Sequence, residues 1–308
     1  MNIFVGEVPL CYTNSLIMAL ASEDYYLHTH YVEALMVMGN GASFIDNDPE
    51  HPIIFFDNGL PDISISNCLK TLGFNFEEFY IENNSEISSK KILEKLRSFL
   101  KKGVVVVGPL DMGYLSYNPN SSTQYGIDHF VTLIDMDENF VYLHDPAGFP
   151  CVKIKIEEFL KSWKAESIHY KRGAFSMWGN IKRMNIPSGR EIFNDTALII
   201  KKRYENSETG VIESYANAIK KNGLNKQQQT IHQYFSFRLA AARNLFMSEF
   251  LKEFDSYGAR IKQQLAFLFG EAHLYSISEE YSRLADTLME IAKLDECFKS
   301  LYTDYKGE

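Results

Sequence analysis

Residues 8–16 read VPLCYTNSL, which places Cys11 where a helix is expected to begin. Far downstream come the segments DHFVTL, which carries His129, and LHDP, which carries Asp145. A thiol, a base and an orienting carboxylate are the groups that acyl transfer through a covalent thioester requires. The order of these three residues therefore predicts a cysteine-dependent catalytic site.

Each of the three residues also has a purely structural interpretation. Cys11 is a small side chain of the kind that is often buried, and His129 fits a hydrogen-bonded strand residue. Asp145 precedes a proline, as aspartates in turns often do. The combination of the three with the local geometry favours the catalytic interpretation.

The start of the predicted helix gives Cys11 a suitable environment. Residues 11–22 follow helical spacing, so the thiol lies at the helix N-terminus. Backbone N–H groups without an intrahelical acceptor and the positive end of the helix dipole stabilise a thiolate there. The same N–H groups are able to hold the oxyanion that forms when a thiolate attacks a carbonyl.

A predicted hairpin brings the other two residues together. Its turn is formed by residues 137–139, and if these three residues are the loop, Met136 faces Phe140. His129 and Asp145 then have the same parity, so their side chains share one face of the sheet. On that face the carboxylate orients the imidazole and stabilises its charged form.

His144 has the opposite parity and is predicted to be structural. A loop that differs by one residue would exchange the roles of His144 and His129.

Composition divides the chain into two predicted domains, 1–187 and 188–308. A length of 308 residues exceeds one typical core, and all nine prolines lie at or before Pro187. The first domain is expected to mix elements, with helices at 11–22, 62–72, 88–100 and 157–163, an ambiguous apolar stretch at 25–38, and strands at 53–56, 74–81, 104–107, 129–136, 140–145 and 174–181. The second is expected to be all-helical, with helices at about 191–222, 227–254, 256–272 and 277–304.

Bulk properties exclude several classes of protein. A hydrophobic content of 45% and a charged content of 23% are ordinary for a soluble globular chain. The net charge of −9 argues against general nucleic-acid binding, which needs a basic surface. The apolar runs are too short to span a membrane, and no secretory signal is apparent, so a cytoplasmic protein is expected. The four scattered cysteines are expected to be free thiols, with no metal site and no cofactor.

At this point the chain resembles a known family. The segments CYTNSL at 11–16, GPLDMGYL at 108–115, DHFV at 128–131 and HDP at 144–146 resemble the N-terminal domain of butirosin biosynthesis protein H. The helical remainder is similar to the domain that often follows it. The resemblance therefore covers nearly the whole chain.

The resemblance implies an α+β, papain-like cysteine acyltransferase or peptidase fold with a C-terminal all-helical domain. The butirosin enzyme moves an aminoacyl group from an acyl carrier protein to an aminoglycoside amine. Carried over, this implies Cys11 as nucleophile, His129 as general base and acid, and Asp145 as the orienting group. Papain-like peptidases place an oxyanion-hole glutamine six residues before the cysteine, where this chain has Val5, so the second oxyanion donor is unidentified.

Three further residues are predicted to bind substrate. Asp111 and Tyr114 either line the pocket and bind a cationic amine acceptor or close a turn, and Asn14 follows the cysteine on the same helix. The expected partners are an acyl carrier protein and a small-molecule amine. Carrier proteins are usually acidic, so docking would need a basic patch, for which the nearest candidates in sequence are Lys153, Lys155, Lys161, Lys164, Lys171 and Arg172.

Two other functions compete with acyl transfer. A cysteine peptidase or amidase of the double-glycine-leader type would let water resolve the same acyl-enzyme. A binding module would keep the fold without catalysis. The helical domain is expected to add no catalytic group and to shape the acceptor pocket, dock a partner or form a homodimer.

Overall fold

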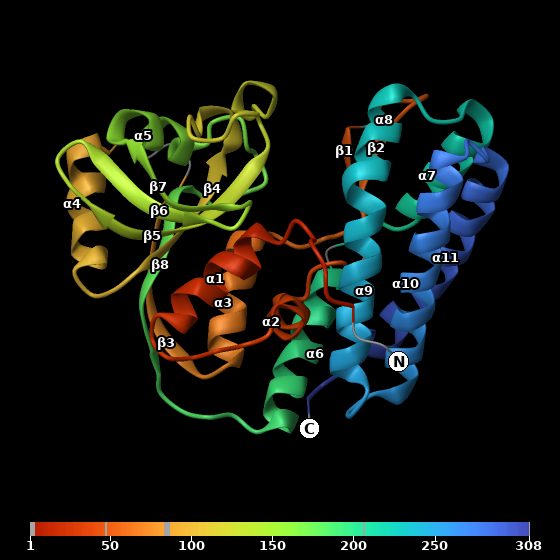
Figure 1. The fold of residues 1–308 in the computed structure, drawn as a ribbon. Helices are drawn as coiled ribbons and strands as arrows, with labels where there is room; N and C mark the ends of the chain where they lie inside the picture. The colour runs from red at the N-terminus through yellow and green to blue at the C-terminus, as the bar shows by residue number, and fades with distance from the viewer. Residues whose placement is uncertain (1–3, 47, 83–86, 206, 308) are drawn as a thin grey trace. The chain divides into compact units, whose positions relative to one another are not determined.

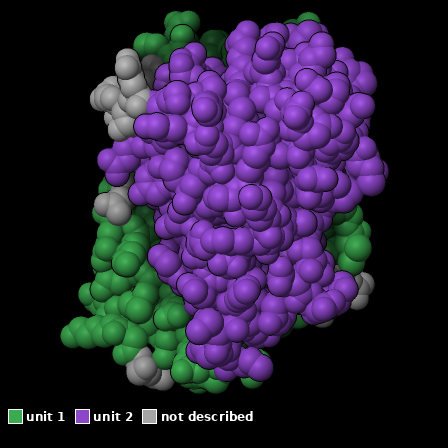
Figure 2. Space-filling view, turned by 90° about the vertical axis from the view of Figure 1, so that its left-hand side faces the viewer, with its two compact units in different colours: residues 1–9, 33–59, 188–308 green, residues 10–32, 60–187 purple. Residues whose placement is uncertain are grey.

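The computed structural model describes residues 4–46, 48–82, 87–205 and 207–307 (Figure 1). The chain forms two compact units, which Figure 2 distinguishes by colour. Unit 1 contains residues 1–9, 33–59 and 188–308, and unit 2 contains residues 10–32 and 60–187.

This division differs from the predicted domains 1–187 and 188–308. The chain does pass from unit 2 to unit 1 after Pro187, but residues 1–9 and 33–59 also group with the helical unit. The physical reason is burial, because Ile54 and Phe56 are 0% and 4% exposed within a core made mainly by the C-terminal helices. A proline count along the chain cannot reveal such a long-range contact.

Unit 2 is built on a six-stranded antiparallel sheet with the strand order β3-β8-β4-β5-β6-β7. In β4 every residue is buried, as expected for a central strand of valines and leucine. The strands are β3 (Phe74–Ile81), β4 (Val105–Asp111), β5 (Asp128–Met136), β6 (Phe140–Asp145), β7 (Phe149–Lys155) and β8 (Ala174–Arg183).

Helices cover both faces of this sheet (Figure 1). On one face, α4 (Ser89–Leu100) and α5 (Ile156–Lys164) contribute to a core with Val131 and Leu133 of β5. The other face is covered by α1 (Cys11–Ala21). Thr132 of β5, whose side chain points to the opposite face from Val131 and Leu133, donates from Oγ1 to the Ser15 carbonyl of α1 at 2.8 Å. This bond ties α1 to the middle of β5.

Two further helices complete the unit. α3 (Pro61–Thr71) begins with proline at a favourable position and packs on β3. Only the first four residues of α2 (Thr29–Met36) belong to unit 2.

The β5–β6 hairpin corrects one predicted register. Next to the turn, Met136 lies opposite Val141 and not, as was predicted, opposite Phe140. A bulge between Leu133 and Asp135 then changes the pairing of β5 with β6 by one residue. Beyond the bulge, Leu133 lies opposite Leu143, as the predicted loop required. The predicted pairing of β5 with β6 is therefore correct away from the turn, although the predicted pairing next to the turn is wrong.

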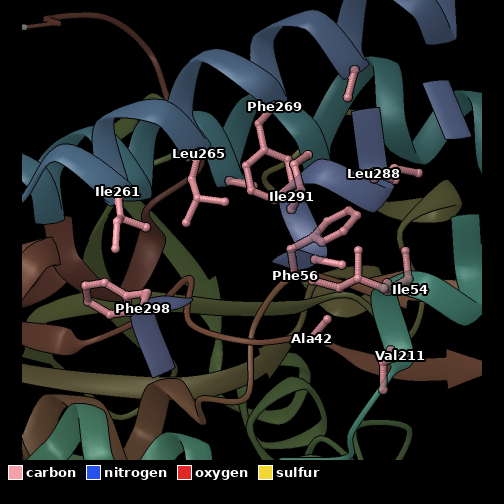
Figure 3. Packing of buried hydrophobic residues seen from close by; sticks show 14 of the residues in the cluster. Ala42, Ile54, Phe56, Val211, Ile261, Leu265, Phe269, Leu288, Ile291 and Phe298 are labelled. Carbon is pink, nitrogen blue, oxygen red and sulfur yellow. The ribbon is translucent and has the colours of Figure 1, made fainter. Parts of the chain in front are cut away.

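Unit 1 is a helical assembly that encloses a short antiparallel pair, β1 (Ser43–Asp46) and β2 (Ile53–Phe55). Figure 3 shows Phe56 and Ile54 among side chains of the C-terminal helices, and the Phe56 ring lies 4.9 Å from that of Phe269. The helices are α6 (Gly189–Glu205), α7 (Val211–Asn222), α8 (Lys226–Ile231), a π-helical turn (His232–Ser236), α9 (Phe237–Leu251), α10 (Ser256–Ile277) and α11 (Tyr281–Thr303).

The predicted helix 191–222 is therefore two helices. Among the residues that are described, no helix is both long enough and apolar enough to cross a lipid bilayer.

Candidate catalytic site

Cys11 is the first residue of α1, as the sequence predicted. Buried neighbours such as Leu10 and Leu16 hold the start of this helix in place, while Cys11 itself is half-buried. Leu10 provides no side-chain cap, and Cys11 lies at the N-terminal end of the helix, where the helix dipole is positive. The other cysteines lie in different settings, with Cys68 fully buried and Cys151 and Cys297 exposed.

His129 and Asp145 form the predicted pair. His129 Nε2 lies 2.7 Å from Asp145 Oδ1, and each residue is 4% exposed. They come from the beginning of β5 and the end of β6, two neighbouring strands of the sheet. Antiparallel pairing brings these two ends together, so the sheet itself positions the imidazole on the carboxylate.

The imidazole also reaches Cys11. The Cys11 side chain is near enough to His129 to raise the pKa of the imidazole through hydrogen bonding. Because Nε2 is engaged with Asp145, Nδ1 is the ring nitrogen that is left for the sulfur. The three predicted catalytic residues thus form one continuous series.

The electrostatics of the series favour charge on the imidazole. Burial alone would lower the pKa of His129, but hydrogen bonds to Asp145 and Cys11 outweigh it and raise the pKa to about 10. For Asp145, burial opposes ionisation, yet hydrogen bonds from His129, the Ala147 N–H and Tyr117 lower the pKa of the carboxyl below its usual value. The site therefore holds a carboxylate beside an imidazolium near neutral pH.

Two tyrosines at the site were not predicted from the sequence. Tyr117 donates from its hydroxyl to Asp145 Oδ2 at 2.8 Å. Tyr170 is 46% exposed and donates to Oδ1 of Asp128, the residue before His129, at 2.8 Å. Burial and the charge of Asp128 raise the pKa of Tyr170.

No sequence signal marks these tyrosines. Both lie in connecting segments, and their positions depend on contacts with distant strands. Asp128, by contrast, can be identified from the sequence, because it directly precedes the predicted base His129.

The structure supports the turn-closing interpretation of Asp111. Its side chain accepts hydrogen bonds from Gly113 N at 2.8 Å and Gly126 N at 3.1 Å, and also from the Ser167 hydroxyl. The residue is 2% exposed, so both oxygens are used inside the protein. Asp111 is therefore not placed to bind an amine, contrary to the substrate-binding prediction.

The other two predicted substrate residues are more accessible. The Tyr114 ring packs edge-on against Tyr125 at 5.3 Å, and Lys161 Nζ lies 4.4 Å from its centroid, so a cation of the chain already occupies one face. Asn14 is half-buried and accepts from Thr29 Oγ1 at 3.3 Å. It lies three residues after Cys11 and hence on the same side of α1.

His144 has the structural role that was predicted for it. Its Nδ1 accepts from the backbone N–H of Cys151 at 3.0 Å, which ties β6 to β7. Asp145 is paired with His129, not with His144.

The predicted basic patch is partly neutralised within the chain. Arg172 pairs with Glu78 at 2.9 Å, and Lys164 pairs with Glu166 at 2.6 Å. Lys171 donates to the Ala165 carbonyl. Lys153 and Lys161 lie over the rings of Phe140 and Tyr114, with Nζ 4.5 Å and 4.4 Å from the ring centroids.

The site has no convergent metal ligands. Within the described part of the chain, no three histidine, cysteine, aspartate or glutamate side chains gather as a metal ion would require. Val5, which stands where papain-like peptidases have their glutamine, is 90% exposed and its side chain has no donor.

Comparison with known proteins relates this chain to YobF in two ways. A model of the YobF C-terminal domain matches residues 206–301. The chain is also similar to the uncharacterized protein YobF of Bacillus subtilis (strain 168), with 30% identity over 307 residues that cover 97% of each chain.

Proposed function

We propose that this chain, which belongs to the YobF family, is a cysteine-dependent acyltransferase with a papain-like catalytic unit. The observation that carries the proposal is the hydrogen-bonded series from Cys11 through His129 to Asp145. A thiol at a helix N-terminus, a base in contact with it and a carboxylate behind the base are the parts of a thiol acyl-transfer site.

The first half-reaction would acylate the enzyme. With His129 as imidazolium, the Cys11 sulfur attacks as thiolate the carbonyl carbon of a thioester donor. The negative oxygen that forms is held by backbone N–H groups at the start of α1. When the tetrahedral intermediate collapses, the donor's C–S bond breaks and the departing thiolate takes the proton from His129.

The second half-reaction would deliver the acyl group to an amine. A neutral amine attacks the Cys11 thioester, and His129, now uncharged, accepts the proton from the attacking nitrogen. Collapse of this intermediate breaks the bond to sulfur, releases an amide and restores the thiolate–imidazolium pair. Asp145 remains ionised throughout and stabilises the imidazolium in both half-reactions.

Transfer from a thioester is favoured over peptide cleavage by one feature of the chain. A peptidase must stabilise the oxyanion and also protonate a poor amine leaving group, whereas a thioester releases a good leaving group. The donor glutamine of papain-like peptidases is replaced here by Val5, which fits the less demanding chemistry. We therefore propose an acyl carrier protein as the donor's carrier and a small amine as the acceptor, in a cytoplasmic setting.

Intact-mass measurement tests the proposal. The protein is incubated with carrier proteins that bear several acyl groups, and then with amines. We expect a mass increase equal to the acyl group, mapped to Cys11, and discharge by an amine faster than by buffer alone. Cys11→Ala should abolish the increase, whereas the matched control Cys151→Ala, at an exposed cysteine, should retain it.

The same experiments would also reveal a hydrolase in place of an acyltransferase. No mass increase with any donor, together with cleavage of a peptide panel that is lost in Cys11→Ala, would support the cysteine peptidase or amidase. No chemistry of either kind at Cys11 would leave a binding module.

A further inference from the structure

We infer that Tyr117 is a positioning residue of this site, which fixes the Asp145 carboxylate and through it the orientation of His129. The inference rests on the proposed function, because it assigns Tyr117 a part in the same thiol chemistry. Tyr117 touches neither the sulfur nor a reacting atom in this scheme and acts only through Asp145.

The first step of the argument is how the carboxylate is held. Asp145 Oδ1 accepts two hydrogen bonds, from His129 Nε2 at 2.7 Å and from the Ala147 N–H at 2.7 Å. Oδ2 accepts from the Tyr117 hydroxyl at 2.8 Å. Three donors that approach two oxygens fix the rotation of the carboxylate about its Cβ–Cγ bond, which a single bond to His129 would leave free.

The second step is that Tyr117 is itself held. Its ring packs edge-on against Phe149 at 5.7 Å, so contact with β7 fixes the direction of the hydroxyl. The next residue, Asn118, is 5% exposed and donates its backbone N–H to the Leu115 carbonyl at 2.8 Å. Both the ring of Tyr117 and the backbone of the residue that follows it are therefore held in place.

The third step is that the hydroxyl is a permanent donor. Burial and the neighbouring Asp145 charge raise the pKa of Tyr117 well above its ordinary value, so the phenol keeps its proton across the range in which an enzyme works. A hydrogen bond to an ionised carboxylate is stronger than one between neutral groups. Tyr117 thus favours both the ionised form and one orientation of Asp145.

Other titratable groups lie near Tyr117 and Asp145, and a test of Tyr117 must leave them unchanged. Cys11 approaches the imidazole from α1, and Asp128 precedes His129 on β5. Tyr170 donates a hydrogen bond to Asp128. Tyr117→Phe leaves all of these groups in place and removes only the donor to Oδ2.

The test is the pH profile of Cys11 alkylation. The full-length protein is treated briefly with limiting iodoacetamide from pH 4 to pH 9, and labelling at each cysteine is mapped by mass spectrometry. The alkylation rate follows the thiolate fraction, and a neighbouring imidazolium, which an oriented Asp145 stabilises, favours the thiolate. In Tyr117→Phe we expect the acid midpoint to move to higher pH, so that labelling at pH 5 falls by about threefold to tenfold.

Two variants calibrate the effect. Asp145→Asn should move the midpoint in the same direction and further. Tyr142→Phe is the matched control, because Tyr142 also donates to an aspartate, Asp137 Oδ2 at 2.7 Å, but at the hairpin turn. It should leave the Cys11 profile unchanged, and thermal unfolding of each variant separates lost stability from lost positioning.

The outcomes distinguish this inference from the proposed function. A reactive Cys11 whose profile is the same in Tyr117→Phe and wild type would overturn the positioning role and leave the thiol site intact. An equal shift in Tyr142→Phe would also overturn it. A wild-type Cys11 that reacts no faster than Cys151 would remove both the thiol site and the role of Tyr117.

Discussion

Burial lowers the pKa of two histidines of this chain, but partners outweigh it at only one of them. At His129 a carboxylate and a thiol outweigh burial, and the charged imidazolium is favoured. At His232, which is 1% exposed in unit 1, the partners are the neutral hydroxyls of Tyr215 and Ser236. Burial there lowers the pKa to about 3, so His232 stays uncharged in the folded protein.

His232 should therefore make the protein sensitive to acid. Below the unfolded-state pKa of about 6.5, the unfolded chain binds a proton at this residue and the folded chain does not, until the pH approaches about 3. The free energy of unfolding should fall with decreasing pH by up to about 1.4 kcal/mol per pH unit from this group. Urea unfolding of His232→Gln between pH 6.5 and 4.5 should show a shallower dependence than wild type.

The control for His232 is His169→Gln, the same substitution at an exposed histidine. A slope that is identical in wild type and His232→Gln would show that another group governs acid unfolding.

At the residue scale the sequence predicted the parts that carry a motif. Cys11, His129 and Asp145 could be found because each stands at a recognisable helix or strand end. Tyr117 and Tyr170 could not, because loop residues reach the site only through tertiary contacts. Asp111 was ambiguous in the sequence, and only its backbone partners show that it closes a turn.

At the element scale, one arginine joins three segments of unit 1. Arg243 of α9 contacts Glu33 of α2 through Nε at 2.9 Å and Asp57 through Nη1 at 3.0 Å. All three side chains are at most 3% exposed. Gly39, at a φ of +77°, allows the α2–β1 connection to pass close by, because a Cβ there would lie 2.8 Å from Arg243 Cβ.

Arg243→Met should destabilise the protein strongly. The change keeps much of the side-chain volume but leaves two buried carboxylates without this cation, which typically costs about 3–5 kcal/mol. Chemical denaturation at pH 7 measures the loss. Lys220→Met is the control, because its ion pair with Asp286 is exposed and should be worth less than about 1 kcal/mol. Equal losses in the two variants would contradict a special role for the buried cluster.

Most elements of unit 2 were predicted close to their observed bounds, whereas β7 was not predicted. Helix α1 and strands β5 and β6 lie within a residue or so of their predicted bounds. β7 was missed because Pro150 and two lysines interrupt its apolar pattern, as is common on an edge strand. The bulge in β5 between Leu133 and Asp135 was not predicted, because one extra residue in a strand leaves the apolar pattern nearly unchanged.

At the scale of the whole molecule, the helical unit depends on residues that precede most of unit 2. Its core includes Val37, Ala42, Ile54 and Phe56, all at most 4% exposed. A fragment of residues 188–308 lacks these side chains and also lacks Glu33 and Asp57. The apolar surfaces that they cover would then be open to water.

We expect the fragment 188–308 to lack cooperative folding by itself. Circular dichroism during urea titration should show a broad, shallow transition, and a synthetic peptide of residues 33–59 added in trans should sharpen it. A scrambled peptide of the same composition is the control. A cooperative transition in the fragment alone would contradict the contribution of residues 33–59.

The interleaving of the two units has a consequence for how such a gene can change. A recombination event near codon 187 would transfer the C-terminal helices without the segment that completes their core. Exchange of either unit between genes would therefore be selected against unless several crossovers occurred together. Lineages that inherit these helices should also inherit a counterpart of residues 33–59 far upstream, and the two stretches should vary in concert.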